Sequence, residues 1–173
     1  FMAEPLLKRT LDFANQFRIQ NGVVSYLGLS VFDTDKEGQY KGNLLNLNAV
    51  DCLNPQMDFL RDKLNGISEG LRIVLQNSGL PANYEGVLGI DGLVYEHNNE
   101  QFIQPCLEIN LRYNMGTLAL KLTNMLHETS SGTYRQFKGK PGEFSAFIES
   151  GTKAQFRNGK LLSGRFPLTP ATP

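Results

Sequence analysis

Two segments with the alternating pattern of β-strands, residues 83–96 and 101–113, are separated by only the four residues HNNE. Such a short connection predicts a β-hairpin, with its tip near Asn99 and Glu100. The register of a hairpin decides which side chains share a face, so this one feature constrains both the fold and any site that the two strands carry.

The position of the tip predicts which residues of the two strands face each other. The apolar side is made by two pairs, Ile90 with Ile109 and Leu88 with Leu111. A slip by one residue would break this side, which supports the register. On the other side Asp91 then faces Glu108. Two carboxylates held opposite each other repel and destabilise the sheet, so the pair predicts a compensating divalent cation.

Strong polar side chains occupy every second position of the second strand, in the stretch PCLEINLRYNMG. Glu108, Asn110 and Arg112 lie on one side of the strand because side chains alternate. Together with Asp91, the first two offer only oxygen ligands, the set that Mg²⁺ prefers. Arg112 carries a permanent charge that suits a phosphoryl or acyl-phosphate oxygen. The following helix begins with free N–H groups that also favour an anion.

Further strands are expected before and after this hairpin. Residues 4–13 are either a strand or an irregular lead-in to one. Residues 23–32 and 39–47 flank the turn-forming DTDKEG and predict a second hairpin. Near the end, FSAFIES (144–150) and AQFRNGKLLSG (154–164) predict a closing hairpin with an Asn-Gly turn.

Two amphipathic helices are predicted between these strands. Apolar residues at three- and four-residue steps indicate a long helix that Asn54 caps and Pro55 begins, and that Gly79 and Pro81 stop. A second helix is expected from Thr117 to Glu128, with Asn114 as a cap and not a ligand. Its apolar side is formed by Leu118, Leu122, Met125 and Leu126. Residues 1–173 therefore read as one α+β unit.

Composition limits the partners and the compartment of the chain. Lys plus Arg and Asp plus Glu are 17 each, so the net charge is zero and no global basic field predicts a nucleic-acid or membrane partner. The basic loop with Arg135, Lys138 and Lys140 can be a local phosphate or carboxylate contact or a solvated loop. Two distant cysteines and no membrane-length apolar run favour a soluble, cytoplasmic protein.

In the two strands that carry Asp91 and Glu108, the sequence resembles the ATP-grasp superfamily of carboxylate-amine or carboxylate-thiol ligases. In that family an Asp on one strand and a Glu-x-Asn on the next bind the Mg²⁺ ions that bridge the ATP phosphates. The matching segments are GVLGIDGLVYE and PCLEINLRYNMG. The resemblance implies that Asp91, Glu108 and Asn110 are metal ligands and that Arg112 is catalytic. It also implies that Glu4 lies next to the adenine and ribose.

The resemblance covers only the second half of the ATP-binding unit. It implies a C-terminal subdomain of a longer chain, with an antiparallel sheet and two main helices packed on it. The cofactors would be Mg²⁺ and ATP, and the partners a small-molecule carboxylate, an amine and the missing N-terminal part of the same chain. The complete enzyme would form an acyl phosphate that the amine attacks, and this chain alone is expected to be inactive. The alternative is a non-catalytic binding or regulatory module.

Overall fold

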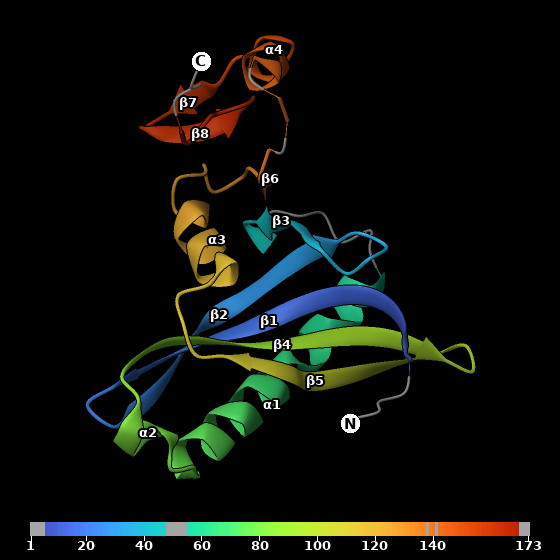
Figure 1. Ribbon diagram of the computed structural model, residues 1–173, viewed down its shortest axis with the longest axis vertical. Coiled ribbons are helices and arrows are strands. Elements are labelled where there is room, and N and C mark those ends of the chain that lie inside the picture. Colours follow the sequence, from blue (N-terminus) through green and yellow to red (C-terminus); the bar gives the residue numbers. More distant parts are fainter. Residues whose placement is uncertain (1–5, 48–54, 138, 141, 170–173) are drawn as a thin grey trace.

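Six strands form one antiparallel sheet in the computed structural model, which describes residues 6–47, 55–137, 139–140 and 142–169 (Figure 1). Their order across the sheet is β5-β4-β1-β2-β3-β6. The strands of this sheet are β1 (Lys8–Gln20), β2 (Val23–Thr34), β3 (Tyr40–Leu45), β4 (Gly86–His97), β5 (Glu100–Asn110) and β6 (Gly132–Arg135). With helices on both of its faces, the chain has the α+β fold that the sequence predicts.

The strand β1 lies in the middle of the sheet and is longer than the segment 4–13 suggested. It pairs with β2 on one side and with β4 on the other. A tight turn at Asn21 and Gly22, both with positive φ, joins β1 to β2. This Asn-Gly turn is a hairpin signal that the sequence interpretation did not use. The predicted pairing of β2 with β3 is confirmed, but β2 has β1 as its second partner.

The long helix α1 (Pro55–Asn77) covers one face of the sheet, as predicted. Alternate residues of β1 point to this helix, and Phe13 and Phe17 are fully buried beneath it. Leu60 and Leu75 of α1 pack against them. The short helix α2 (Leu80–Asn83) follows and was not predicted, because Gly79 and Pro81 were taken only as stop signals.

The helix α3 (Met115–Thr123) packs on the opposite face of the sheet. Leu122 of α3 and Leu126, which follows the helix, pack in one buried cluster with Leu45 of β3. The predicted end at Glu128 was wrong, because the backbone of residues 125–127 bonds to Leu161 instead of continuing the helix. Met125 was also assigned to the packed side, but its side chain is 43% exposed.

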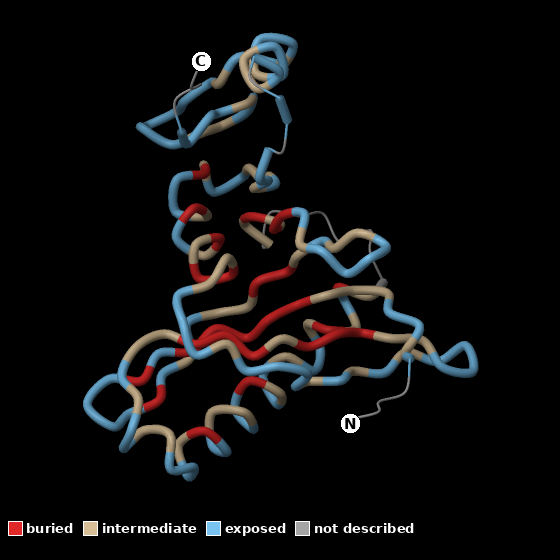
Figure 2. Tube along the Cα trace, viewed as in Figure 1, coloured by how far each residue is buried: buried red, intermediate tan, exposed pale blue. Residues whose placement is uncertain are grey.

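The C-terminal residues differ most from the prediction. The expected loop 130–144 contains β6, which pairs with β3. The segment FSAFIES is not a strand but the helix α4 (Glu143–Glu149), and rings at helical spacing, Phe144 and Phe147, both pack on Phe137. The Asn-Gly turn is confirmed and joins β7 (Gln155–Arg157) to β8 (Lys160–Ser163). Figure 2 shows that α4, β7 and β8 are mostly exposed.

None of the helices in the described part of the chain combines the length and the apolar character needed to cross a membrane.

Candidate functional site

The hairpin of β4 and β5 has the register that the sequence predicts at its polar pair. Asp91 faces Glu108, and Ile90 faces Ile109 on the other side of the ribbon. Ile90 is buried against α1, whereas Ile109 is 46% exposed, so the apolar side is only partly covered. The expected pairing of Leu88 with Leu111 was wrong, because β5 ends at Asn110.

The register reaches the polar pair through a bulge that the sequence interpretation missed. The tip lies at Asn98 and Asn99, both with positive φ, one residue earlier than predicted. Leu93 pairs with Gln104, so β5 carries extra residues before the polar pair is reached. Pro105 lies within this bulge and has no N–H to give to the ladder. The early tip and the bulge offset each other, so that Asp91 still faces Glu108.

Hydrogen bonds connect the side chains of the predicted polar row. Nδ2 of Asn110 donates to Oδ2 of Asp91 at 3.2 Å. Nη2 of Arg112 donates to Oδ1 of Asn110 at 3.1 Å. A turn bond from the backbone N of Arg112 to the carbonyl of Asn110 holds the arginine beside the strand. The structure thus brings Asp91, Glu108, Asn110 and Arg112 together at one end of the hairpin.

The electrostatics of the pair are unfavourable without a cation. Asp91 is half-buried and Glu108 is exposed. Burial, and next the neighbouring charge of Glu108, raise the pKa of Asp91 to about 6. The hydrogen bond from Asn110 and the charge of Arg112 oppose this rise in the pKa. A positive charge placed between the two carboxylates would therefore be stabilised by both.

This raised pKa predicts a pH-dependent affinity for metal. A ligand carboxylate must lose its proton to bind a metal, so protonation of Asp91 competes with the ion. Mg²⁺ affinity should fall by about tenfold for each pH unit below about 6. Calorimetric titration with Mg²⁺ at about pH 5 and about pH 7.5 measures the effect. Equal affinities at the two pH values would contradict the role of Asp91.

The N-terminus of α3 follows the end of β5 and lies close to β4 at Asn114. Oδ1 of Asn114 accepts a hydrogen bond from the backbone N of Thr117 at 3.0 Å, which confirms that Asn114 is a cap. Its Nδ2 would lie 2.6 Å from a Cβ at Gly89, so only glycine on β4 allows this close approach. The segment between Asn110 and α3 is therefore held against β4 by packing.

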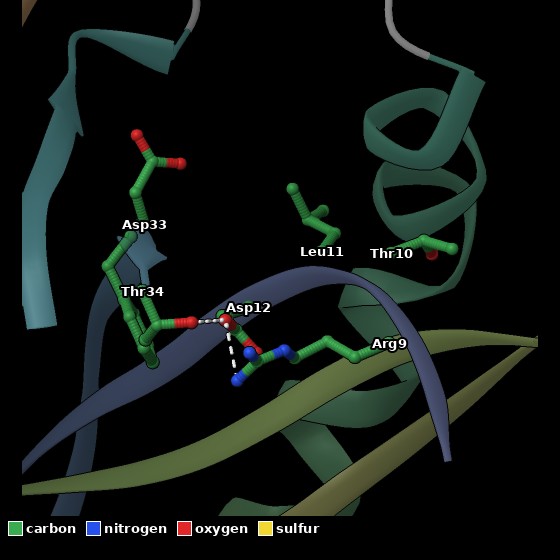
Figure 3. Close-up of a pocket in the computed structure, with 7 residues that line it drawn as sticks. Arg9, Thr10, Leu11, Asp12, Asp33 and Thr34 are labelled. Carbon is green, nitrogen blue, oxygen red and sulfur yellow. Dashed lines mark hydrogen bonds and ion pairs between the residues drawn. The ribbon is translucent and has the colours of Figure 1, made fainter. Parts of the chain in front are cut away.

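A second polar group, which the sequence interpretation missed, lies on β1 and β2 (Figure 3). Oγ1 of Thr34 donates to Oδ2 of Asp12 at 2.8 Å, and Nη1 of Arg9 lies 3.4 Å from the same oxygen. These residues line a cavity of about 200 Å³. Burial raises the pKa of Asp12, and the charge of Asp12 raises the pKa of Asp91. The sequence signal that could have identified this group was Asp12, a carboxylate between the apolar residues of β1.

The remaining predicted residue, Glu4, lies outside the described residues. In the part of the chain that the structure describes, no three His, Cys, Asp or Glu side chains lie close enough together to hold a metal. The predicted site has two carboxylates and the amide of Asn110, a set of oxygen donors that suits Mg²⁺ better than a transition metal.

Comparisons with known proteins find distant likenesses in structure. No protein-family model matches the sequence, and no curated protein matches it. Solved structures that resemble the chain include a carboxylase and a synthetase. A pyruvate carboxylase variant from Rhizobium etli, solved with the allosteric activator acetyl coenzyme A, is 16% identical with a TM-score of 0.45. N5-carboxyaminoimidazole synthetase from Staphylococcus aureus, solved with ADP, is 12% identical with a TM-score of 0.38.

These likenesses cover much of this chain but only part of the other two. The matches span 73% and 75% of this chain, and 11% of the carboxylase and 34% of the synthetase. Both TM-scores lie below 0.5, so the likenesses decide neither the family nor the function. A function for this chain can therefore be proposed only from its own residues.

Proposed function

We propose that this chain is the Mg-ATP-binding half of an ATP-dependent carboxylate-amine ligase. The observation that carries the proposal is the cross-strand pair of Asp91 and Glu108, with Asn110 and Arg112 in contact beside it. Opposed carboxylates weaken a sheet, and a site for a divalent cation gives a physical reason for the arrangement. The sequence resemblance of the same residues to ATP-grasp ligases supports the choice of Mg²⁺ and ATP.

The donor set fits Mg²⁺, which would be held by Asp91, Glu108 and Asn110. A bound Mg²⁺ would neutralise phosphate charge in a phosphoryl transfer. Oδ1 of Asn110 accepts from Arg112 in this structure. As a metal ligand, this oxygen would release the guanidinium, which is exposed and can then bind a phosphoryl oxygen. Metal binding and phosphate binding would thereby be coupled through one amide.

The cavity beside Asp12 offers a place for an uncharged part of the nucleotide. Thr34 and Arg9 both contact Oδ2 of Asp12, and Oδ1 has no hydrogen-bond partner among the described residues. A half-buried carboxylate with a spare oxygen suits hydroxyl donors, such as those of a ribose. Glu4, which the resemblance places near the adenine and ribose, belongs to the same proposal.

The proposed reaction has two steps, and this chain would position the phosphates in the first. A carboxylate oxygen of the substrate attacks the γ-phosphorus of ATP, the bond to the bridging oxygen breaks, and ADP leaves. An amine then attacks the acyl carbon of the acyl phosphate, inorganic phosphate leaves, and the amine loses a proton. Arg112 would stabilise the charge on the transferred group. The remaining groups would come from the other half of the protein.

A calorimetric titration of the chain with Mg-ATP tests the proposal. Replacing Glu108 by glutamine removes one ligand charge, and affinity should fall at least about tenfold. The matched control is Glu100→Gln, which removes the same charge from an exposed position at the other end of β5. This control should bind like the unaltered chain. Equal losses in the two variants, or equal binding by all three proteins, would refute the proposed site.

A further inference from the structure

A second cavity, of about 390 Å³, lies at the outer edge of β2. Its described lining comes from both faces of the sheet, because Met57 and Leu64 belong to α1, whereas Ala119 and Leu120 belong to α3. Figure 1 shows these two helices on opposite faces of the sheet. The cavity therefore wraps round the edge of β2, with an apolar wall on each side of the plane of the sheet.

The backbone of β2 is open on this edge. Nδ2 of Asn43 donates to the carbonyl of Val31 at 3.2 Å, so the backbone groups of Val31 point away from β1 and toward β3. Backbone direction alternates along a strand, and the N–H and C=O of Leu29 therefore point to the same edge. Pairing with β3 begins only at Phe32, and no described strand pairs with Leu29 on this side. Leu29 lines the cavity, so a donor and an acceptor of the backbone lie beside it.

Side chains close both ends of this open stretch. Oε1 of Gln76 accepts from the backbone N of Val24 at 2.9 Å, and Asn43 occupies the carbonyl of Val31. Only residues 25–30 lie between these two bonds, and a bulge at Leu27 interrupts their pairing with β1. A peptide that adds a strand to a sheet needs a longer and more regular edge. The open stretch is therefore better matched to a small molecule.

The lining of the cavity is neutral or already paired. Arg61 is the charged member among the described lining residues. Its guanidinium lies 3.8 Å from a carboxylate oxygen of Asp58 and donates to the carbonyl of Leu47. The other polar lining residues carry hydroxyl or amide groups: Tyr26, Ser30, Asn46 and Thr123. Ligand pockets commonly combine apolar walls with a few neutral hydrogen-bonding groups, as this cavity does.

We propose that this cavity binds a flat, uncharged heterocycle that carries a hydrogen-bond donor next to an acceptor, as a cyclic amide does. The ring would continue the plane of the sheet beside Leu29, taking the N–H of this residue on its acceptor and donating to the C=O. Its two faces would pack on the apolar side chains of α1 and α3.

Other classes of ligand fit this cavity less well. A purely apolar molecule would bury the backbone groups of Leu29 without giving them a partner, which is costly. A charged molecule would lose its water without gaining an opposite charge that is not already paired. The cavity lies on the far side of β1 from the hairpin of β4 and β5, so this inference does not depend on the proposed Mg-ATP site.

NMR titration of the full chain with carbostyril, a flat bicyclic cyclic amide, tests the inference. The backbone amide resonance of Leu29 should shift and saturate. The N-methyl derivative of carbostyril lacks the N–H donor and should bind about fivefold more weakly or worse. Leu64→Trp should fill the cavity and weaken the binding of carbostyril by at least about tenfold. The matched control Val74→Trp adds the same ring to α1 at a side chain that is 68% exposed, and it should bind like the unaltered chain.

Several outcomes would overturn the inference. Carbostyril that leaves the resonance of Leu29 unmoved would do so, as would equally tight binding of its N-methyl derivative. Unaltered binding by Leu64→Trp, or tighter binding of a capped four-residue peptide of alternating threonine and valine, would also overturn it. Circular dichroism checks the fold of Leu64→Trp, and the comparison with the N-methyl derivative decides the outcome if that variant unfolds.

Discussion

Replacing Asp91 by asparagine should make the metal-free protein more stable at neutral pH and its stability indifferent to Mg²⁺. Folding raises the pKa of this carboxyl from 3.8 to about 6, so the folded chain binds its proton more tightly than the unfolded chain does. The free energy of unfolding therefore falls as pH rises from about 4 to about 6, and the loss is complete above that window. Allowing for solvent screening of a half-exposed group, Asp91→Asn should add about 1–2 kcal/mol at pH 7.

In the presence of Mg²⁺ the same substitution should have the opposite effect, because it removes the stability that the metal adds. A metal that binds only the folded chain adds about 2.7 kcal/mol at a concentration of a hundred times its Kd. The unaltered protein should show this gain in the presence of Mg²⁺, and Asp91→Asn should not. Urea denaturation at about pH 7, with and without Mg²⁺, measures both effects.

The matched control for this experiment is Asp62→Asn, on the exposed side of α1. Asp62 forms no ion pair with the described residues, so its replacement should change the free energy of unfolding by less than about 0.5 kcal/mol. This control should keep the full response to Mg²⁺. A variant Asp91→Asn that is less stable than the unaltered chain without metal, or that still responds to Mg²⁺, would refute the site.

Replacing Gly116 by alanine should strongly destabilise the protein. A Cβ at this position would lie 2.3 Å from Nε2 of Gln16 and 2.4 Å from Oγ of Ser30, and both of these side chains are buried. Gln16 donates to Ser30 at 3.1 Å and accepts from Oγ1 of Thr117 at 3.1 Å. The new methyl group would separate buried groups that hydrogen-bond α3 to the sheet. We expect a loss of about 2–4 kcal/mol.

The same substitution at Gly66 should have the opposite sign. Gly66 lies inside α1 on an exposed surface, and no atom lies within 4 Å of a Cβ built there. Alanine has the higher helix propensity, so Gly66→Ala should stabilise the protein by up to about 1 kcal/mol. Denaturant midpoints at constant m-value compare the two variants. A neutral Gly116→Ala would show that α3 does not need this close approach.

The polar row of β5 was predictable because its spacing is local. Side chains alternate on any strand, so Glu108 and Asn110 share a face whatever the rest of the chain does. The pairing with Asp91 was predicted from an assumed tip and was confirmed. The predicted tip was one residue late, and the missed bulge at Pro105 corrected the error. The pairing register of β4 and β5 is set by which residues of each strand lie on the apolar side and which on the polar side. This constraint on the register is stronger than the number of residues in the turn.

The C-terminal elements were less predictable because their signals compete. The segment at 144–150 is short and apolar, and such a run fits a strand or a helix. The ring of Phe137, which precedes it by several residues, contacts Phe144 and Phe147 only in the helical form. The strand β6 was assigned to a loop because its partner β3 lies far away in the sequence.

The sequence by itself determined the side chains of the candidate metal site, because a two-residue period and one short connection place them on one face of one hairpin. Only the tertiary structure decided that Asp12 belongs near them. Asp12 reaches this face because β1 pairs with β4, and a contact between distant segments has no periodicity that a single sequence displays. Tertiary packing also buries Asp91 in part, and burial is the main cause of its raised pKa.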